Sequence, residues 1–139
     1  MTYRSFAATN SILSTPEQLV GPDKQIVTEN SGGKRGHTVA SIPSSRYVST
    51  PGAIVWARRV RACAAFRSPT PGNNVVHVRV IDSNNVYGQE YLGTINTTTN
   101  YLRFCSPYMS HTNPNAAVTG SVNSGAYDLR VAYISLEFE

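Results

Sequence analysis

The sequence predicts an all-β protein, an antiparallel β-sandwich of the jelly-roll type with about eight strands. Short segments of alternating or continuous apolar residues recur along the chain, and clusters of Gly, Pro, Asn, Asp and Ser separate them. Almost none of these segments has the 3.6-residue apolar period of an amphipathic helix. With 139 residues and 40% hydrophobic content, the chain can bury one core.

The N-terminal part lacks such a pattern. Residues 1–24 show no sustained period and contain Pro16, Gly21 and Pro22. We therefore expect residues 1–24 to form an extended arm that packs on the domain or on a neighbouring molecule, and residues 25–139 to form a single β-sandwich domain. No apolar run has the length of a signal peptide or the ~20 residues of a membrane span, so we expect neither export nor a membrane partner.

The expected strands follow from short apolar stretches bounded by turn residues. In the last of them the apolar positions change parity near Tyr133, which predicts a β-bulge between Tyr133 and Ser135. The eight segments are 24–29, 37–42, 53–66, 74–82, 86–95, 101–108, 116–122 and 126–139.

The segment 53–66, AIVWARRVRACAAF, is among the most apolar in the chain and yet carries three arginines. In a helix the arginines would point in separate directions, so no face of the helix could be buried without also burying an arginine. In a strand, successive side chains alternate between the two faces. This alternation predicts that Trp56 and Val60 face the core, whereas Arg59 and Arg61 face away from it.

The segment 74–82 repeats the arrangement and predicts that Val76, Val78 and Val80 are core residues. If the segments 53–66 and 74–82 pair as a hairpin, their polar side chains share one surface of one sheet. That surface would be lined by Arg59, Arg61, His77 and Arg79.

The charges divide the chain into two parts. No acidic residue occurs between Glu29 and Asp82, whereas basic residues are concentrated there, and nearly all of these are arginine. Arginine suits bidentate pairing with carboxylate or phosphate. We favour pairing with carboxylates of a neighbouring subunit over nucleic acid, because exposed lysines and a nucleic-acid-binding motif are lacking. The candidate interface or anion-binding residues are Arg58, Arg59, Arg61, Arg67, His77 and Arg79.

No motif identifies a reaction. The SGGKRG stretch lacks the spacing of a phosphate-binding loop, there is no G-x-S-x-G elbow, and the histidines lie on separate segments. We therefore expect a non-enzymatic protein without catalytic, cofactor-binding or metal-binding residues. Cys63 and Cys105 match no zinc spacing and fit two reduced core thiols better than the alternative, a single disulfide.

Tyrosine is enriched from residue 87 onward. Exposed aromatic rings beside Asn and Asp are typical of a sugar-binding surface, although Tyr is also a common strand residue. The candidate glycan-binding residues in the loops 84–91 and 106–115 are Asn85, Tyr87, Tyr91 and Tyr108.

The segments 53–82 and 116–139, the Ser-, Thr- and Asn-rich composition and the irregular arm resemble small jelly-roll structural proteins of virions. Bacteriophage head-decoration (cement) proteins and fibre-head domains are examples. The resemblance covers roughly residues 25–139 and includes no diagnostic motif. It implies a virion protein that forms a homo-oligomer, a homotrimer, and binds a viral capsid protein through its arm or its basic face. The alternative is a lectin-like carbohydrate-binding module, and a third possibility is a coat subunit that contacts nucleic acid through its arginines.

Overall fold

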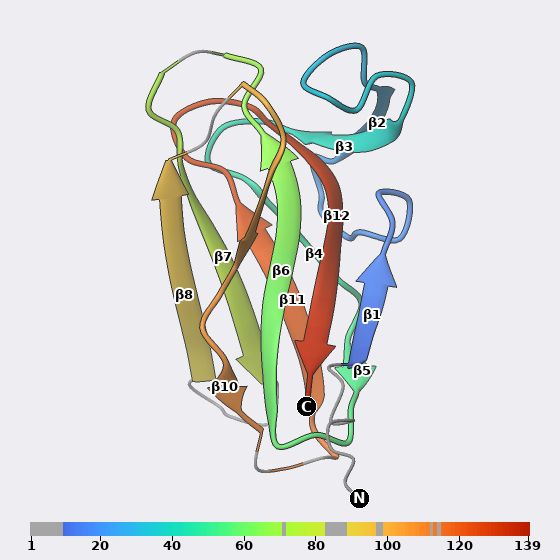
Figure 1. Cartoon of the computed structure of the whole chain (residues 1–139), viewed down its shortest axis with the longest axis vertical. Helices are drawn as coiled ribbons and strands as arrows, with labels where there is room; N and C mark the ends of the chain where they lie inside the picture. Colours follow the sequence, from blue (N-terminus) through green and yellow to red (C-terminus); the bar gives the residue numbers. More distant parts are fainter. Residues whose placement is uncertain (1–9, 71, 83–88, 97–98, 112, 114) are drawn as a thin grey trace, which may run out of the picture.

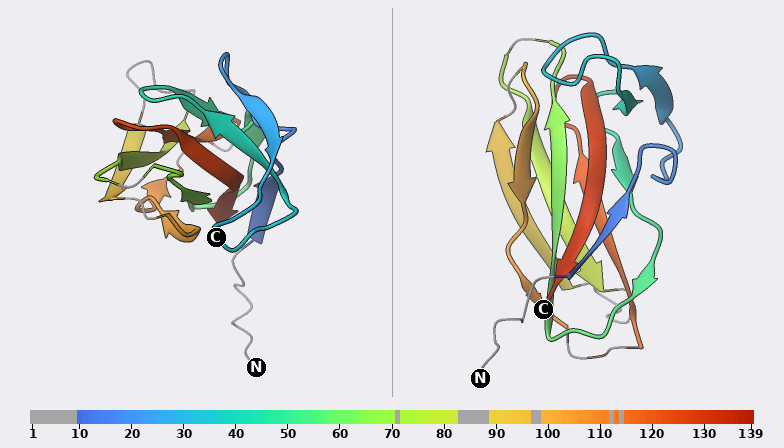
Figure 2. Two further views of the ribbon diagram at one scale, coloured as in Figure 1. Left: turned by 90° about the horizontal axis from the view of Figure 1, so that it is seen from above. Right: turned by 45° about the vertical axis from the view of Figure 1, so that its right-hand side comes forward.

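The computed structural model describes residues 10–70, 72–82, 89–96, 99–111, 113 and 115–139, and for 89–96 it describes the backbone. The described chain is all-β and forms two antiparallel sheets packed as a sandwich, which confirms the predicted fold class. Figures 1 and 2 show the two layers, with β6 and β12 in one and β7 and β11 in the other. The strands are β1 Asn10–Ser14, β2 Gln25–Thr28, β3 Thr38–Ile42, β4 Tyr47–Ser49, β5 Ala53–Ile54, β6 Arg59–Arg67, β7 Val75–Asp82, β8 Gln89–Asn96, β9 Leu102–Cys105, β10 Met109–Ser110, β11 Ala117–Asn123 and β12 Leu129–Phe138.

Short strands share the edges of long ones, and this explains why the described residues contain more strands than the eight expected. In sheet A, with the order β10-β6-β12-β3-β2, β9 also pairs with β6 and β1 also pairs with β12. In sheet B, with the order β4-β11-β7-β8, β5 also pairs with β11. Each of the long strands β6, β11 and β12 therefore has two short partners along one of its edges.

The inner faces of the two sheets meet in one hydrophobic core. β6 contributes Val60 and Phe66, and β7 contributes Val76, Val78 and Val80, all fully buried as the alternation predicts. The sheets approach each other closely at Gly120 of β11, where an added Cβ would lie only 2.9 Å from the Cβ of Ala62. Glycine at this position lets the two layers approach.

The predicted bulge lies in β12. Its pairing with β6 runs in register up to Val131 and shifts between Val131 and Tyr133, just before the range Tyr133 to Ser135 in which the bulge was expected. The shift lets Val131 and Ile134 both face the core, although they differ in parity.

The segment 53–66 is not one strand. Residues 53–54 pair with β11 of sheet B, and the chain then crosses to sheet A, where β6 begins at Arg59. Because the chain changes sheets here, the exposed positions Ile54, Trp56 and Arg58 do not share a face with the buried Val60. The prediction that Trp56 is a core residue was therefore wrong, and its side chain is 76% exposed. The predicted hairpin of 53–66 with 74–82 was also wrong, since β6 and β7 belong to different sheets.

Part of the expected N-terminal arm packs on the domain. Asn10–Ser14 form β1 and pair with the last strand, Asn10 opposite Phe138 and Ser14 opposite Ile134. Leu19 is buried in the core. The boundary at residue 24 stays a prediction. Among the described residues, no helix has the length and apolar character that crossing a membrane would require.

Candidate functional site

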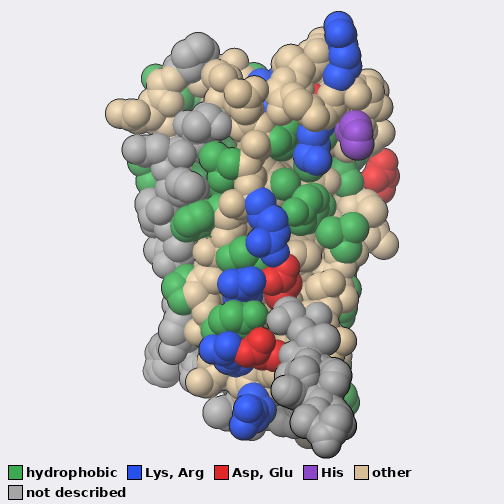
Figure 3. Space-filling model, viewed as in Figure 1, with side chains coloured by type: hydrophobic (Ala, Val, Ile, Leu, Met, Phe, Trp, Pro, Cys, Tyr) green, Lys and Arg blue, Asp and Glu red, His purple; other side chains and the backbone are tan. Residues whose placement is uncertain are grey.

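The arginines at the start of β6 lie on the outer face of sheet A and are paired within the chain. Arg59 bonds to Glu139, with its Nε 2.7 Å from Oε1, and Arg61 donates from Nε and Nη2 to Glu137 at 3.0 and 2.8 Å. Arg103 of β9 bonds to the other oxygen of Glu137. Figure 3 shows the resulting row of basic and acidic side chains along this face.

Tyr108 lies against the same row. The guanidinium carbons of Arg59 and Arg61 lie 4.1 and 4.7 Å from the centre of its ring, so the ring takes part in two cation–π contacts. Burial acts to raise the pKa of Glu137, but the bonds from Arg61 and Arg103 outweigh it and hold this pKa below its usual range. The carboxylates that these arginines were predicted to find on a neighbouring subunit are thus present on the adjacent strand of the same chain.

Arg67 ends β6 in a buried ionic cluster. It donates to both carboxylate oxygens of Glu29, from Nε at 2.9 Å and from Nη2 at 2.7 Å, and the Tyr101 hydroxyl donates to the same carboxylate at 2.8 Å. The bonds from Arg67, opposed by burial and supported by Tyr101, lower the pKa of Glu29 from 4.5 to about 2. The cluster fixes the β2–β3 connection against the sandwich. There Gly32 has a positive φ of 71°, and an added Cβ would lie 2.3 Å from Cδ of Arg67.

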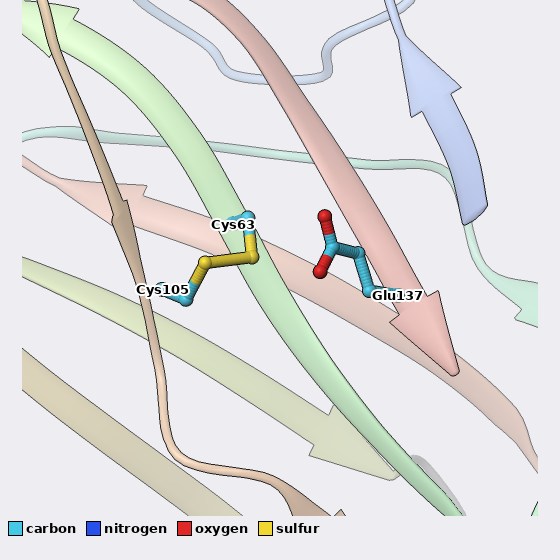
Figure 4. Close-up of side chains that lie close together, drawn as sticks. All are labelled: Cys63, Cys105 and Glu137. Carbon is cyan, nitrogen blue, oxygen red and sulfur yellow. A yellow bond between two sulfur atoms is a disulfide. The ribbon is translucent and has the colours of Figure 1, made fainter. Parts of the chain in front are cut away.

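Cys63 of β6 and Cys105 of β9 form a disulfide, so the expectation of two reduced thiols was wrong. They lie directly opposite each other in the β6–β9 register, which sequence spacing cannot reveal. Figure 4 shows the Glu137 carboxylate beside the two sulfur atoms. The three ligand atoms lie within 4.8 Å of one another, but the sulfurs are bonded to each other and the carboxylate is bonded to arginines. This arrangement disfavours a metal ion.

His77 and Arg79 project from β7 on the outer face of sheet B, away from Arg59 and Arg61. The predicted common surface of Arg59, Arg61, His77 and Arg79 was therefore wrong, because the two pairs lie on opposite faces of the sandwich. The role of each in binding stays a prediction.

The outer face of sheet B carries a hollow of about 300 Å³. Its floor is β11, where Thr119, Ser121 and Asn123 alternate with residues that face the core; Thr119 and Asn123 are half-buried, and Ser121 is buried. Tyr47, whose side chain is 46% exposed, closes one side, and Arg79 lies on the other. The full lining is Tyr47, Ser49, Arg79, Ile81, Thr119, Ser121 and Asn123.

This hollow offers the groups that a sugar needs. Hydroxyl and amide side chains both donate and accept hydrogen bonds, an aromatic ring presents an apolar surface, and a guanidinium adds fixed donors. The hollow lies on a rigid sheet, because β11 is paired with β4 and β5 on one edge and with β7 on the other. Such a face can orient a polar ligand without rearranging.

Of the predicted glycan-binding residues, Tyr108 is the one whose side chain the structure describes, and it does not line this hollow. Tyr108 lies on the opposite face of the sandwich, against Arg59 and Arg61. The structure describes only the backbone of Tyr91, which lies in β8 opposite Val80 of β7. Asn85 and Tyr87 lie outside the described residues. The signal that could have found the hollow is the stretch 118–123, VTGSVN, which alternates small or apolar residues with hydrogen-bonding ones.

Neither a family model nor a curated protein matches the chain. Solved structures do match it. The C-terminal CBM6 of LamC, a laminarinase from Zobellia galactanivorans, is 10% identical and superposes with a TM-score of 0.63, over 91% of this chain and 98% of that one. A family 35 carbohydrate-binding module from Clostridium thermocellum is 12% identical, with a TM-score of 0.63 over 91% and 97%. This chain has the jelly-roll sandwich of these modules.

Two further solved structures share the sandwich. The module CBM6cm-2 of lichenase 5A from Cellvibrio mixtus, solved with cellotriose, is 13% identical, with a TM-score of 0.60 over 92% of this chain and 97% of that one. The CBM22-1–GH10 part of xylanase 10B from Clostridium thermocellum is 11% identical, with a TM-score of 0.65. The superposition covers 90% of this chain and 27% of that one. Some of these modules are thus parts of larger enzymes.

The comparisons correct the expected relationship to virions. The matched structures are carbohydrate-binding modules, so the prediction of a bacteriophage capsid decoration or fibre protein was wrong, although its jelly-roll fold was right. The resemblance rested on composition and architecture, which many unrelated jelly rolls share.

Proposed function

We propose that this protein is a non-enzymatic carbohydrate-binding module that holds a glycan chain on the outer face of sheet B. One observation carries the proposal: the hollow places three hydrogen-bonding side chains of β11 beside the exposed ring of Tyr47. Sugar rings expose hydroxyl groups at their edges and C–H groups on their faces, and this surface offers partners for both. The fold shared with a module solved with cellotriose supports the same function.

The geometry assigns distinct roles to the lining. The Tyr47 ring provides the apolar platform for one sugar face, and Asn123, two positions beyond Ser121 on the same strand, can donate and accept at the hydroxyl groups. Two positions on one strand face are about 7 Å apart, so Thr119, Ser121 and Asn123 form a row along β11. A chain of sugars that follows this row would meet one polar side chain at each step.

A binding assay with site variants tests the proposal. Soluble glucan, xylan, mannan and galactan are titrated with the parent, Tyr47→Ala and Asn123→Ala by calorimetry or affinity electrophoresis. We expect at least one polysaccharide to bind the parent and each variant to weaken that binding about tenfold, equivalent to ~1.4 kcal/mol. Tyr133→Ala, which removes a half-buried tyrosine on sheet A, is the matched control and should bind as the parent does. If both hollow variants bind as tightly as the parent, glycan does not bind at this face.

A further inference from the structure

We propose a second ligand site at the crossing from β5 to β6, where the protein binds an anionic sugar that bears a carboxylate or sulfate group. The site is distinct from the sheet B hollow and rests on the proposed function only for the carbohydrate nature of its ligand. It consists of Trp56 and of a cavity of about 550 Å³ lined by Arg58, Arg59, Ser110 and Glu139. Small-molecule sites usually have volumes of about 300–1,000 Å³.

The crossing presents its large side chains on one side. Ile54 is 54% exposed, Trp56 is 76% exposed and Arg58 is exposed, whereas Val55 is buried and Ala57 packs against the core. Alternate residues of an extended chain point the same way and are about 7 Å apart. Ile54, Trp56 and Arg58 therefore form one ridge that ends at the cavity.

The ridge is held rigidly from both sides. The buried His111 places Nε2 3.1 Å from the carbonyl oxygen of Val55 and Nδ1 3.2 Å from Asp82, and its backbone N–H donates to the Arg58 carbonyl at 2.8 Å. The backbone N–H groups of Arg58 and Arg59 both donate to the carbonyl of Glu139. An indole exposed on such a fixed backbone loses little conformational entropy when a ligand stacks on it.

The charges at the cavity favour an anionic ligand. Arg59 is neutralised by Glu139 and lies over the Tyr108 ring. Arg58, within the described part of the chain, has no carboxylate in bonding distance, so it leaves one unmatched guanidinium at the cavity. A guanidinium binds carboxylate or sulfate in a bidentate manner. A sugar ring stacked on Trp56 would bring an acidic substituent within reach of Arg58.

The site is tested with acidic and neutral polysaccharides on the intact chain. Alginate and polygalacturonate supply carboxylates, a carrageenan supplies sulfates, and neutral glucan supplies neither. We expect the parent to bind at least one acidic polymer, and Trp56→Ala and Arg58→Gln each to weaken that binding at least tenfold. Arg35→Gln is the matched control, because it removes the same charge from the β2–β3 turn at the other end of the sandwich and should change binding less than twofold.

The outcomes separate this site from the sheet B hollow. The Tyr47→Ala variant should bind the acidic polymer as tightly as the parent does, and the Trp56→Ala variant should bind the neutral polymer as tightly as the parent does. If the parent binds an acidic polymer but no neutral polymer, the proposed function is contradicted and this site is not. The site is refuted if no acidic polymer binds, if Arg58→Gln binds as the parent does, or if single-stranded DNA displaces the acidic polymer at equal charge concentration, since the ligand would then be any polyanion.

Discussion

Acid should destabilise this protein through one buried carboxylate, that of Glu29. Its side chain is fully buried, bonded to Arg67 and Tyr101, and has a pKa lowered from 4.5 to about 2. A carboxyl whose pKa is lower in the folded state adds stability that is fully present above pH ~4.5 and is lost as the pH falls toward ~2. The whole shift corresponds to about 3 kcal/mol, of which about 2 kcal/mol is lost by pH 3.

The variant Glu29→Gln isolates this contribution. At pH 7 it should lower the free energy of unfolding by about 3 kcal/mol, because the buried Arg67 loses its anionic partner. Urea unfolding of parent and variant at pH 7 and pH 3 gives the difference at each pH. We expect this difference to shrink by about 2 kcal/mol at pH 3, because the carboxyl of the parent is then protonated in the unfolded state and must lose its proton on folding.

An exposed ion pair provides the control. Asp23 bonds to Arg46 at 2.8 Å with both side chains about half exposed, so Asp23→Asn should cost less than about 1 kcal/mol at pH 7. If Glu29→Gln costs no more than Asp23→Asn, or if its cost is the same at both pH values, then the Glu29 carboxylate does not anchor the β2–β3 connection as we argue.

Three further changes test the packing by thermal or urea unfolding. Trp56→Ala should change the free energy of unfolding by no more than about 0.5 kcal/mol because the ring is exposed, whereas Phe66→Ala should cost about 3–5 kcal/mol; equal losses would place Trp56 in the core. Replacing both Cys63 and Cys105 by Ala should cost roughly 2–4 kcal/mol, since the bond closes a long loop, and an unchanged midpoint would show that the bond does not form. Gly120→Ala should cost about 1–3 kcal/mol because its Cβ would crowd Ala62, and a neutral result would show that the sheets can separate there.

Alternation along the chain predicted the parts of the fold that depend on local pattern. It placed Val60, Val76, Val78 and Val80 in the core and directed Arg59 away from it, because a half-buried strand must alternate. The same rule failed at Trp56. The chain leaves sheet B after Ile54 and enters sheet A at Arg59 without a Gly or Pro between them, so the sequence carries no sign of the change.

The features that were missed depend on pairing between distant segments. The disulfide requires Cys63 and Cys105 to lie opposite each other, and this follows from the β6–β9 register. The hollow requires Tyr47 of β4 to lie beside β11, which follows β4 by about seventy residues in the sequence. Composition shows that such residues exist, but only the strand order brings them together.

The ion pairs within the chain determine where net positive charge remains on the surface of the molecule. Arg59 has its own carboxylate, but Glu137 is shared by Arg61 and Arg103, and Glu29 is shared by Arg67 and Arg130, so the flank of the sandwich keeps a small positive excess. Within the described residues, Lys24, Lys34, Arg35 and Arg58 have no carboxylate partner. Figure 1 places the β2–β3 turn, which holds Lys34 and Arg35, and the crossing from β5 to β6, which holds Arg58, at opposite ends of the long axis. At low ionic strength a polyanion would therefore be attracted to both ends of the long axis as well as to the arginine row of sheet A, and added salt would weaken this attraction.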